Sequence, residues 1–257
     1  MERLNDNQTP RGLTASGIRN WGYLFILLGI VAKCLIQNGL LGIDGMTAQQ
    51  LLALMEQSEQ SMMLVTASIV MQALESCAIP IFALLLVEGF CKTADWKRYL
   101  GRLALVAAVS EIPYNLAMSG KVLDLSSRNP VFALVLGLAM LWFYRYCAEK
   151  SGKNTAIKLL VTLAAIAWSG MLSIEHGAFF LLMTAVLWLT RGKSYRILVG
   201  VVAAAVGCGL SLQYVVAPFS FLAVHFYNGE KGESNRIVNM LCYPLMLLAV
   251  YAAAFLI

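Results

Sequence analysis

Long apolar segments recur along almost the whole of this 257-residue chain. A segment of about 17–25 apolar residues, when helical, spans the hydrocarbon core of a bilayer. Hydrophobic residues make up 60% of the chain and charged residues 13%, whereas soluble domains are about 45–50% apolar and about 25% charged. A membrane β-barrel would instead show alternating segments of about ten residues. The sequence therefore predicts an all-α, polytopic transmembrane helical bundle.

The apolar segments predict about nine spans. They lie at about 21–41, 61–90, 99–118, 130–146, 155–172, 174–190, 195–211, 212–227 and 237–257. Pro80 is expected to kink the long second span or divide it into two half-helices. Residues 1–20 are expected to form a polar cytoplasmic tail, with Ser16 capping the first helix, and residues 21–257 a single integral membrane domain.

The distribution of Lys and Arg predicts the orientation of the bundle, because these residues collect in cytoplasmic loops. With the N-terminus inside, all 19 Lys and Arg residues except Lys33, Lys121 and Arg128 fall on the cytoplasmic side. The outer segment 42–60 contains three acids and no base. We therefore expect a multi-pass protein of the cell inner (plasma) membrane, with a cytoplasmic N-terminus and the lipid bilayer as a partner.

Metal and disulfide chemistry have no support in the sequence. The six cysteines are scattered without a CxxC pair, so each is interpreted as a buried, reduced thiol. The chain has no HExxH motif and no Cys/His cluster, and no metal site is predicted. The formal net charge of +5 is attributed to membrane topology, and no nucleic-acid partner is expected.

Four ionisable residues lie at membrane depth, where each costs about 2.5–3.5 kcal/mol on insertion scales and is therefore a functional candidate with a partner. They are Lys33, Glu75, Glu88 and Glu111. Lys33 shares a helix face with Gln37, and the mid-span Glu75 is its expected counter-ion. Lys33 is interpreted either as half of a pair that assists assembly or as a substrate contact.

Glu88 and Arg102 lie near the cytoplasmic ends of consecutive spans, which the short loop CKTADWKR joins. The two side chains are expected to pair across this helical hairpin, since a partly desolvated Arg–carboxylate pair is stronger than a surface pair. Two interpretations stay open: a clamp without chemistry, or a contact with an anionic or phosphate-bearing ligand from the cytosol. Lys231, in the turn FYNGEKG, is a further binding candidate, although NGEKG lacks the spacing of a phosphate-binding P-loop.

Glu111 opens the quartet EIPY, in which Pro113 denies the helix one hydrogen bond. A buried carboxyl beside a broken helix, with Asn115 one turn later, is a candidate general base or acid. His176 is expected at the outer end of the sixth span and His225 at the inner end of the eighth. Each histidine is interpreted either as a hydrogen-bonded anchor or as a residue that binds or acts on a substrate.

Several stretches of the chain follow one another in a recognisable order. They are GLTAS, PIFALLLVEGF, KRYLGRLALVAAVSEIPYNL, RNPVFALVLGL, EHGAFF, FYNGEKG and YPLMLLAVY. In this order they resemble the TraX family of membrane proteins, named for a conjugal-transfer protein associated with pilin N-terminal acetylation. The resemblance implies a helical membrane acyltransferase, distantly similar to the type 3 acyltransferases. Such an enzyme moves an acetyl group from cytosolic acetyl-CoA to a pilin, peptide or surface-polymer acceptor.

Glu88, Arg102, Glu111 and Asn129 match positions of that family, but other positions depart from it. The first span lacks the family's Asp-His pair, Met246 stands where the last span typically has His, and Asn115 replaces an acid. These losses suggest that the chemistry is rerouted or lost while the fold is kept. An acyltransferase with Glu111 or a remaining histidine as base, a non-catalytic membrane scaffold, and a transporter or lipid-binding protein therefore stay open as functions.

Overall fold

The computed structural model describes residues 12–43, 45–147 and 152–255, and in these residues it forms helices and no strand. The predicted all-α class is confirmed. Two isolated backbone bridges, Leu13–Tyr227 and Arg128–Ile174, tie loops together. The elements are α1 (Ala15–Ile30), the π-helix η1 (Val31–Leu41), α2 (Ala48–Gln57), α3 (Glu59–Glu75), α4 (Ala78–Lys92), α5 (Trp96–Ser119), α6 (Val131–Tyr146), α7 (Gly152–Met171), α8 (Gly177–Leu189), α9 (Arg196–Val206), η2 (Gly207–Gly209), η3 (Leu212–Ser220), α10 (Phe221–His225) and α11 (Arg236–Phe255).

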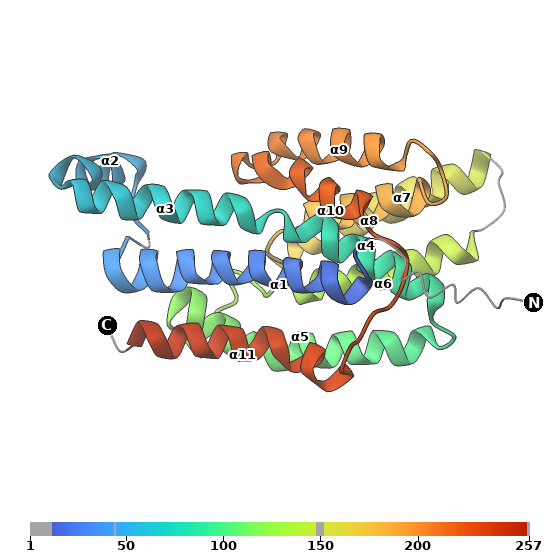
Figure 1. Ribbon diagram of the computed structural model, residues 1–257, viewed down its shortest axis with the longest axis horizontal. Helices are drawn as coiled ribbons and strands as arrows, with labels where there is room; N and C mark the ends of the chain where they lie inside the picture. The colour runs from blue at the N-terminus through green and yellow to red at the C-terminus, as the bar shows by residue number, and fades with distance from the viewer. Residues whose placement is uncertain (1–11, 44, 148–151, 256–257) are drawn as a thin grey trace, which may run out of the picture.

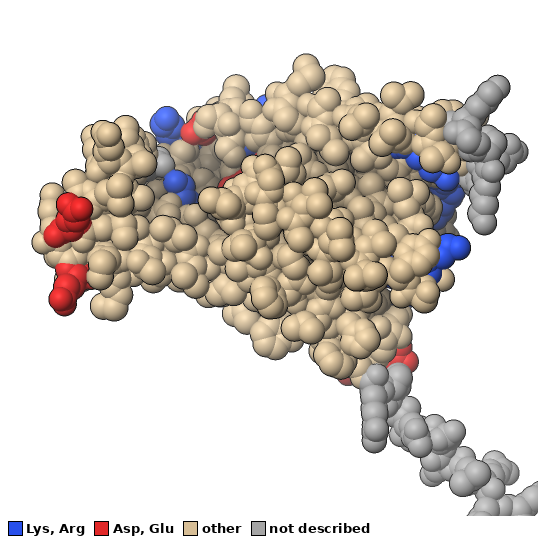
Figure 2. Space-filling view, turned by 90° about the horizontal axis from the view of Figure 1, so that it is seen from above, with Lys and Arg blue, Asp and Glu red and all other residues tan. Residues whose placement is uncertain are grey.

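Apolar helices occupy each of the predicted spans. Within the described residues, four helical stretches are long and apolar enough to cross a membrane: Ala15–Leu41, Glu59–Lys92, Asn154–Met171 and Arg236–Phe255. Shorter apolar helices pack beside one half of the bundle (Figure 1): Val131–Tyr146, Gly177–Leu189, Arg196–Gly209 and Leu212–His225. The 24-residue α5 occupies the third predicted span. In Figure 2 basic side chains gather at one end of the molecule and acidic ones mark the opposite tip. A small group of basic and acidic side chains lies near that tip, and the middle of this face is uncharged. The number of spans and the cytoplasmic N-terminus stay predictions.

One expectation about the helix ends was wrong. The first helix begins at Ala15, and Thr14, not Ser16, caps it by accepting a hydrogen bond from the Gly17 N–H at 3.2 Å. The segment 42–60, predicted to lie on the outer side, contains the short helix α2. Thr47 and Gln50 form a capping box at its start, and such reciprocal hydrogen bonds stabilise a helix without burial.

The long second span is divided into the half-helices α3 and α4, as Pro80 predicted. The break falls at Ser76 and Cys77, just before α4. Pro80 is the third residue of α4, in the first turn, where the missing N–H costs no hydrogen bond. Glu75 is therefore the last residue of α3 and lies beside the break, near the middle of the bundle.

The buried apolar residues form two clusters that face each other. One centres on α4, α6 and α8, with the largest buried side chains of these helices at its middle. The other joins α1 and η1 to α5 and α11. Where α1, α4, α5 and α11 come together, the two clusters do not fill the space between them, and a cavity remains.

Close helix packing around α9 makes a stability prediction. A methyl group at Gly200 of α9 would overlap the buried ring of Phe221. We expect Gly200→Ala to destabilise the fold by about 1–3 kcal/mol through overpacking, visible as a lower melting temperature in detergent. Gly170→Ala is the matched control, because no atom lies within 4 Å of the added methyl there. Equal melting temperatures for the two variants would contradict this packing.

Candidate functional site

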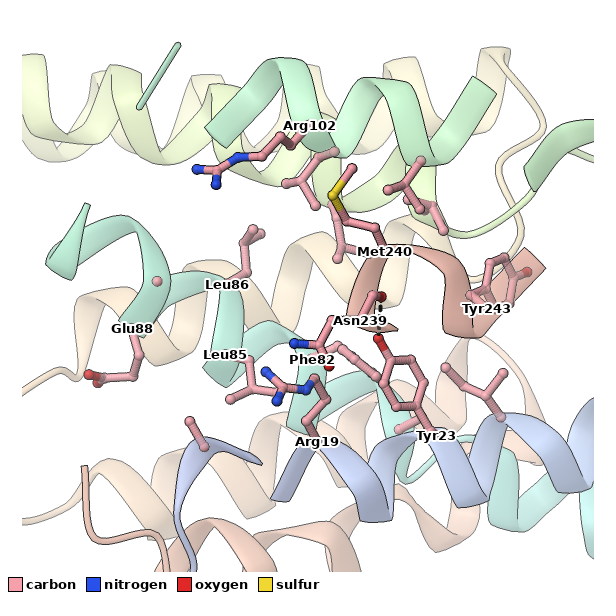
Figure 3. Close-up of a pocket in the computed structure, with 18 of the residues that line it drawn as sticks. Arg19, Tyr23, Phe82, Leu85, Leu86, Glu88, Arg102, Asn239, Met240 and Tyr243 are labelled. Atoms are coloured by element: carbon pink, nitrogen blue, oxygen red, sulfur yellow. Dashed lines mark hydrogen bonds between the residues drawn. The ribbon is translucent and has the colours of Figure 1, made fainter. Parts of the chain in front are cut away.

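A cavity of about 1070 Å³ lies among α1, α4, α5 and α11. Its middle section is walled by apolar side chains that include Phe82, Leu85 and Leu86 (Figure 3). One end is surrounded by basic residues, and the other reaches the break between α3 and α4. The cavity thus connects two polar regions through an apolar section.

Five basic side chains line one end of this cavity, here called the basic rim. They are Arg19, Lys92, Arg102, Lys231 and Arg236. Among the described residues, no carboxylate lies within 4.0 Å of the charged groups of any of them except Lys92. Arg19 and Arg102 reach the cavity from opposite sides, on α1 and α5 (Figure 3). Every residue of the rim belongs to the set predicted to be cytoplasmic.

The segment 226–235, here called the strap, joins α10 to α11 and brings Lys231 to the rim. Backbone hydrogen bonds fix it to the start of α1: Leu13 N–H donates to the Phe226 carbonyl at 2.7 Å and Ser16 N–H to the Lys231 carbonyl at 3.1 Å. The Lys92 ammonium donates to the Gly229 carbonyl at 2.5 Å. The motifs GLTAS and FYNGEKG, far apart in sequence, therefore build one side of the rim.

The expected ion pair between Glu88 and Arg102 is not formed, and this prediction was wrong. Glu88 instead lies 3.6 Å from Arg196, 3.8 Å from Lys92 and 3.9 Å from Arg191. The Arg102 Nε–H donates to the Arg98 carbonyl at 3.1 Å, one turn earlier in α5. Figure 3 shows Glu88 and Arg102 on separate walls. The α8–α9 connection and α9 supply the partners of Glu88, and the sequence did not indicate that they approach it.

The deep end of the cavity is lined by Glu75, Glu175 and His176, here called the acid–histidine cluster. His176 precedes α8 with a left-handed backbone (φ 56°), which turns the chain back into the bundle. Its Nδ1 lies 3.0 Å from the Tyr214 hydroxyl and 3.3 Å from the Gln213 amide nitrogen. Among the described residues no hydrogen bond reaches Nε2, which leaves this ring nitrogen for a ligand.

A second, polar cavity of about 210 Å³ meets the first at this cluster. Glu75, Glu175 and His176 line both cavities, and Lys33 and Gln37 of η1 line the smaller one. The predicted polar stripe of the first span thus faces the bundle interior, and its Lys33 shares a cavity wall with Glu75. The acid–histidine cluster accordingly separates a large chamber with a basic rim from a small polar chamber.

Gly29 of α1 makes room for the cluster. A methyl group at this position would overlap the Glu75 carboxylate. The glycine therefore allows α1 to pass close to the break between the half-helices. A side chain here would push Glu75 out of the cavity wall.

Glu111 and Asn129 come together as a pair outside both cavities. The Asn129 amide donates to Glu111 Oε2 at 2.5 Å and to the Ala107 carbonyl at 3.0 Å. Arg128 lies 3.8 Å from the other Glu111 oxygen. Asn115 is buried nearby, with its amide 3.5 Å from the Val122 carbonyl. These residues fix the loop between α5 and α6 and line neither cavity.

The other predicted site residues also divide into those that line a cavity and those that do not. Arg102, Lys231, Glu88 and His176 line the large cavity, and Lys33 lines the small one. His225 is exposed at the end of α10, against Phe226. Sequence reasoning missed Glu175, although it directly precedes His176 in EHGAFF, because that motif was placed at the membrane surface.

Removing the Glu111 carboxylate is expected to destabilise the α5–α6 loop. Glu111→Ala leaves the buried Asn129 amide without its charged acceptor, and hydrogen bonds to charged groups contribute about 1.5–3 kcal/mol. We expect a lower melting temperature, measured in detergent. Glu56→Ala, which removes an exposed acid of α2, should leave the melting temperature unchanged. An unchanged value for Glu111→Ala would mean that the pair does not support the fold.

The fold and its cavities define a class: an integral membrane helical bundle with an internal, polar-ended ligand cavity. The family model described as TraX protein matches residues 50–253. The chain belongs to the TraX family, as the sequence motifs predicted. No curated protein and no solved structure matches the chain.

Proposed function

We propose that this protein is a membrane acyltransferase that takes an acetyl group from cytosolic acetyl-CoA and transfers it to an acceptor in or across the membrane. One observation carries the proposal: a single cavity joins a rim of basic side chains to the half-buried acid–histidine cluster at its deep end. The basic rim suits the phosphates of a donor, and the cluster suits the transfer step. Family membership agrees with a TraX-like membrane protein.

The rim is proposed to bind the phosphate groups of acetyl-CoA. Arginine guanidinium groups hold phosphate oxygens through two parallel hydrogen bonds, and Arg19 and Arg102 face the cavity from opposite walls. Lys231 of the strap adds a third charge. Glu88 is assigned a supporting role, because its contacts with Arg191 and Arg196 order the basic side chains next to the rim.

The apolar middle section is proposed to hold the arm of the donor, so that the thioester reaches the acid–histidine cluster. His176 takes the proton from an acceptor hydroxyl or amine through Nε2 as general base, in the tautomer that carries its own proton on Nδ1 and donates it to the Tyr214 hydroxyl oxygen. The acceptor oxygen or nitrogen then bonds to the thioester carbon, the carbon–sulfur bond breaks, and the CoA thiolate leaves toward the rim. Glu75 and Glu175, on the same wall, stabilise the positive charge that develops on the imidazole.

The sequence favoured Glu111 as the base, but its place outside both cavities favours His176 instead. Glu111 is held by Asn129 and Arg128, so a proton transfer from an acceptor in either chamber does not reach it directly. Asn129 and Asn115 are likewise assigned to the support of the loop.

Binding and transfer are tested together on purified protein in detergent. Titration with CoA in a calorimeter should give heat of binding, and radiolabelled acetyl-CoA with membrane extract should label an acceptor. The acceptor classes to separate by electrophoresis are pilin, peptide and surface polymer. If the protein gives no binding heat with CoA and no labelled acceptor, the proposal is overturned and the non-catalytic scaffold on the same fold is favoured.

A further inference from the structure

A chain of hydroxyl groups leads from the acid–histidine cluster toward the loop between α5 and α6. The Tyr114 hydroxyl donates to Glu175 Oε2 at 2.8 Å and lies 2.7 Å from the Ser127 Oγ. Because Tyr114 gives its proton to the carboxylate, the Ser127 hydroxyl must be the donor of the second bond. The two hydroxyls therefore both point their protons toward Glu175.

The two ends of this chain lie in different surroundings. Tyr114 is buried, at 2% exposure, and belongs to the EIPY quartet of α5. Ser127 is half-buried in the α5–α6 loop, and its neighbours Leu125 and Ser126 are exposed. The basic rim lies toward the other end of α5, where Tyr99 and Arg102 line the cavity. The chain thus leads away from the rim.

The backbone holds this arrangement in register. Arg128 N–H donates to the Ser173 carbonyl at 2.8 Å, and Glu175 N–H donates to the Arg128 carbonyl at 3.0 Å. Ser127 and Glu175 are therefore the chain neighbours of Arg128 and Ile174, the two residues of one short backbone bridge. The Glu111–Asn129 pair fixes the same loop from the other side.

We propose that Tyr114 and Ser127 form a proton relay between Glu175 and the surface of the α5–α6 loop. Chains of hydrogen-bonded polar groups inside membrane proteins commonly carry protons. In the inward direction, Ser127 passes its proton to the Tyr114 oxygen, Tyr114 passes its own to Glu175 Oε2, and water restores the Ser127 hydroxyl. Each of the two hydroxyl oxygens gains one proton and loses one, so that the net transfer is one proton from water to Glu175. Rotation of the two hydroxyls reverses the direction.

The role of the relay in turnover rests on the proposed acyl transfer. In that reaction the acceptor loses a proton to the acid–histidine cluster, and the CoA thiolate leaves toward the rim, where it takes a proton from water. The relay returns the cluster to its starting charge by carrying the acceptor's proton from Glu175 to the loop surface. No net proton is consumed, but one is released at the loop face and one is taken up at the rim.

Several other titratable groups lie around Glu175. They are Glu75 at the end of α3, Lys33 of η1, His176, Tyr214 of η3 and Tyr243 of α11. In the loop itself, hydrogen bonds from the Ser126 side chain and backbone lower the pKa of Asp124 to about 2. Asp124 therefore stays ionised across the neutral range and does not contribute to a proton signal there.

The relay is tested by infrared spectroscopy on protein reconstituted in one orientation in vesicles. The protonated-carboxyl band of Glu175 is identified by its loss in Glu175→Gln. After a jump to acidic pH on the loop face, the wild-type band should respond at least tenfold faster than that of Tyr114→Phe or Ser127→Ala. A jump on the rim face, which reaches Glu175 through the large cavity, should give equal rates in all three proteins.

Tyr144→Phe is the matched control, because Tyr144 is also buried but its hydroxyl contacts Thr162 instead of the cluster. Its Glu175 band should respond at the wild-type rate after a pH jump on either face. Equal loop-face rates in the wild type and in both relay variants, or a Glu175 band that ignores the loop-face pH, would overturn the relay. The measurement needs no acyl transfer, so a failure of the proposed function is seen separately, as missing label from acetyl-CoA.

Discussion

Replacing His176 with alanine is expected to lower kcat for acetyl transfer by about 10²–10⁴-fold, the usual contribution of a positioned general base. The imidazole lines both chambers, and Nε2 is the ring nitrogen left for a substrate. The measurement is the initial rate of label transfer from acetyl-CoA, with the folded yield followed by gel filtration. Because donor binding at the rim is retained, the calorimetric affinity for CoA should change little.

The chain offers a close control for this result in its other histidine. His225 is exposed at the end of α10 and lines neither cavity, so His225→Ala should keep the wild-type rate. Full activity in His176→Ala would remove the acid–histidine cluster from the transfer step. A loss of activity in both variants would show that the histidines act on the fold and not on the chemistry.

Removing two charges from the basic rim should have the second largest effect. Each charge-assisted hydrogen bond to phosphate contributes about 1.5–3 kcal/mol, and 1.4 kcal/mol is a factor of ten in affinity. We therefore expect Arg19→Gln combined with Arg102→Gln to weaken CoA binding by about 10²-fold or more in calorimetry. In the transfer assay KM for acetyl-CoA should rise while kcat changes little, because the cluster is untouched.

Arg98→Gln is the control for the loss of positive charge. Arg98 is one turn from Arg102 on α5, is largely exposed, and pairs with Asp95 at 3.0 Å outside the cavity. Its substitution should leave the affinity for CoA unchanged. If the double variant binds CoA as tightly as Arg98→Gln does, the rim is not a phosphate site.

The half-helix at Pro80 and the positions of the apolar helices were predictable because they follow from local rules. Proline cannot continue backbone hydrogen bonding, and an apolar segment of sufficient length forms a helix in lipid. The placement of Glu88 was not predictable in this way. Its partners Arg191 and Arg196 lie about one hundred residues away in sequence. The packing of α8 against α4 and of α9 against α8 brings them to Glu88, and the short hairpin to Arg102 does not outweigh it.

The candidate site likewise contains residues that were predictable from the sequence and residues that were not. Lys33, His176 and Lys231 were predicted as binding residues from their residue type and depth, and the structure places them on cavity walls. Glu111 was singled out by the EIPY motif, but its carboxylate holds Asn129 and the α5–α6 loop in place. Its neighbour Tyr114, three residues on, reaches the cluster instead, because the helical turn directs it toward Glu175.

The sequence by itself determined that this chain is a helical membrane protein of the TraX family, since hydropathy and ordered motifs are properties of local segments. It also determined that Lys33, Glu75, Glu88 and Glu111 must find partners inside the bundle, although it missed Glu175. Only the tertiary structure decided which partners they find. The cluster of Glu75, Glu175 and His176 is assembled from the end of one half-helix and the turn before α8. Their meeting depends on the packing of α3 against α1, on that of α8 against α4, and on the room that Gly29 leaves. No single segment of the sequence determines it.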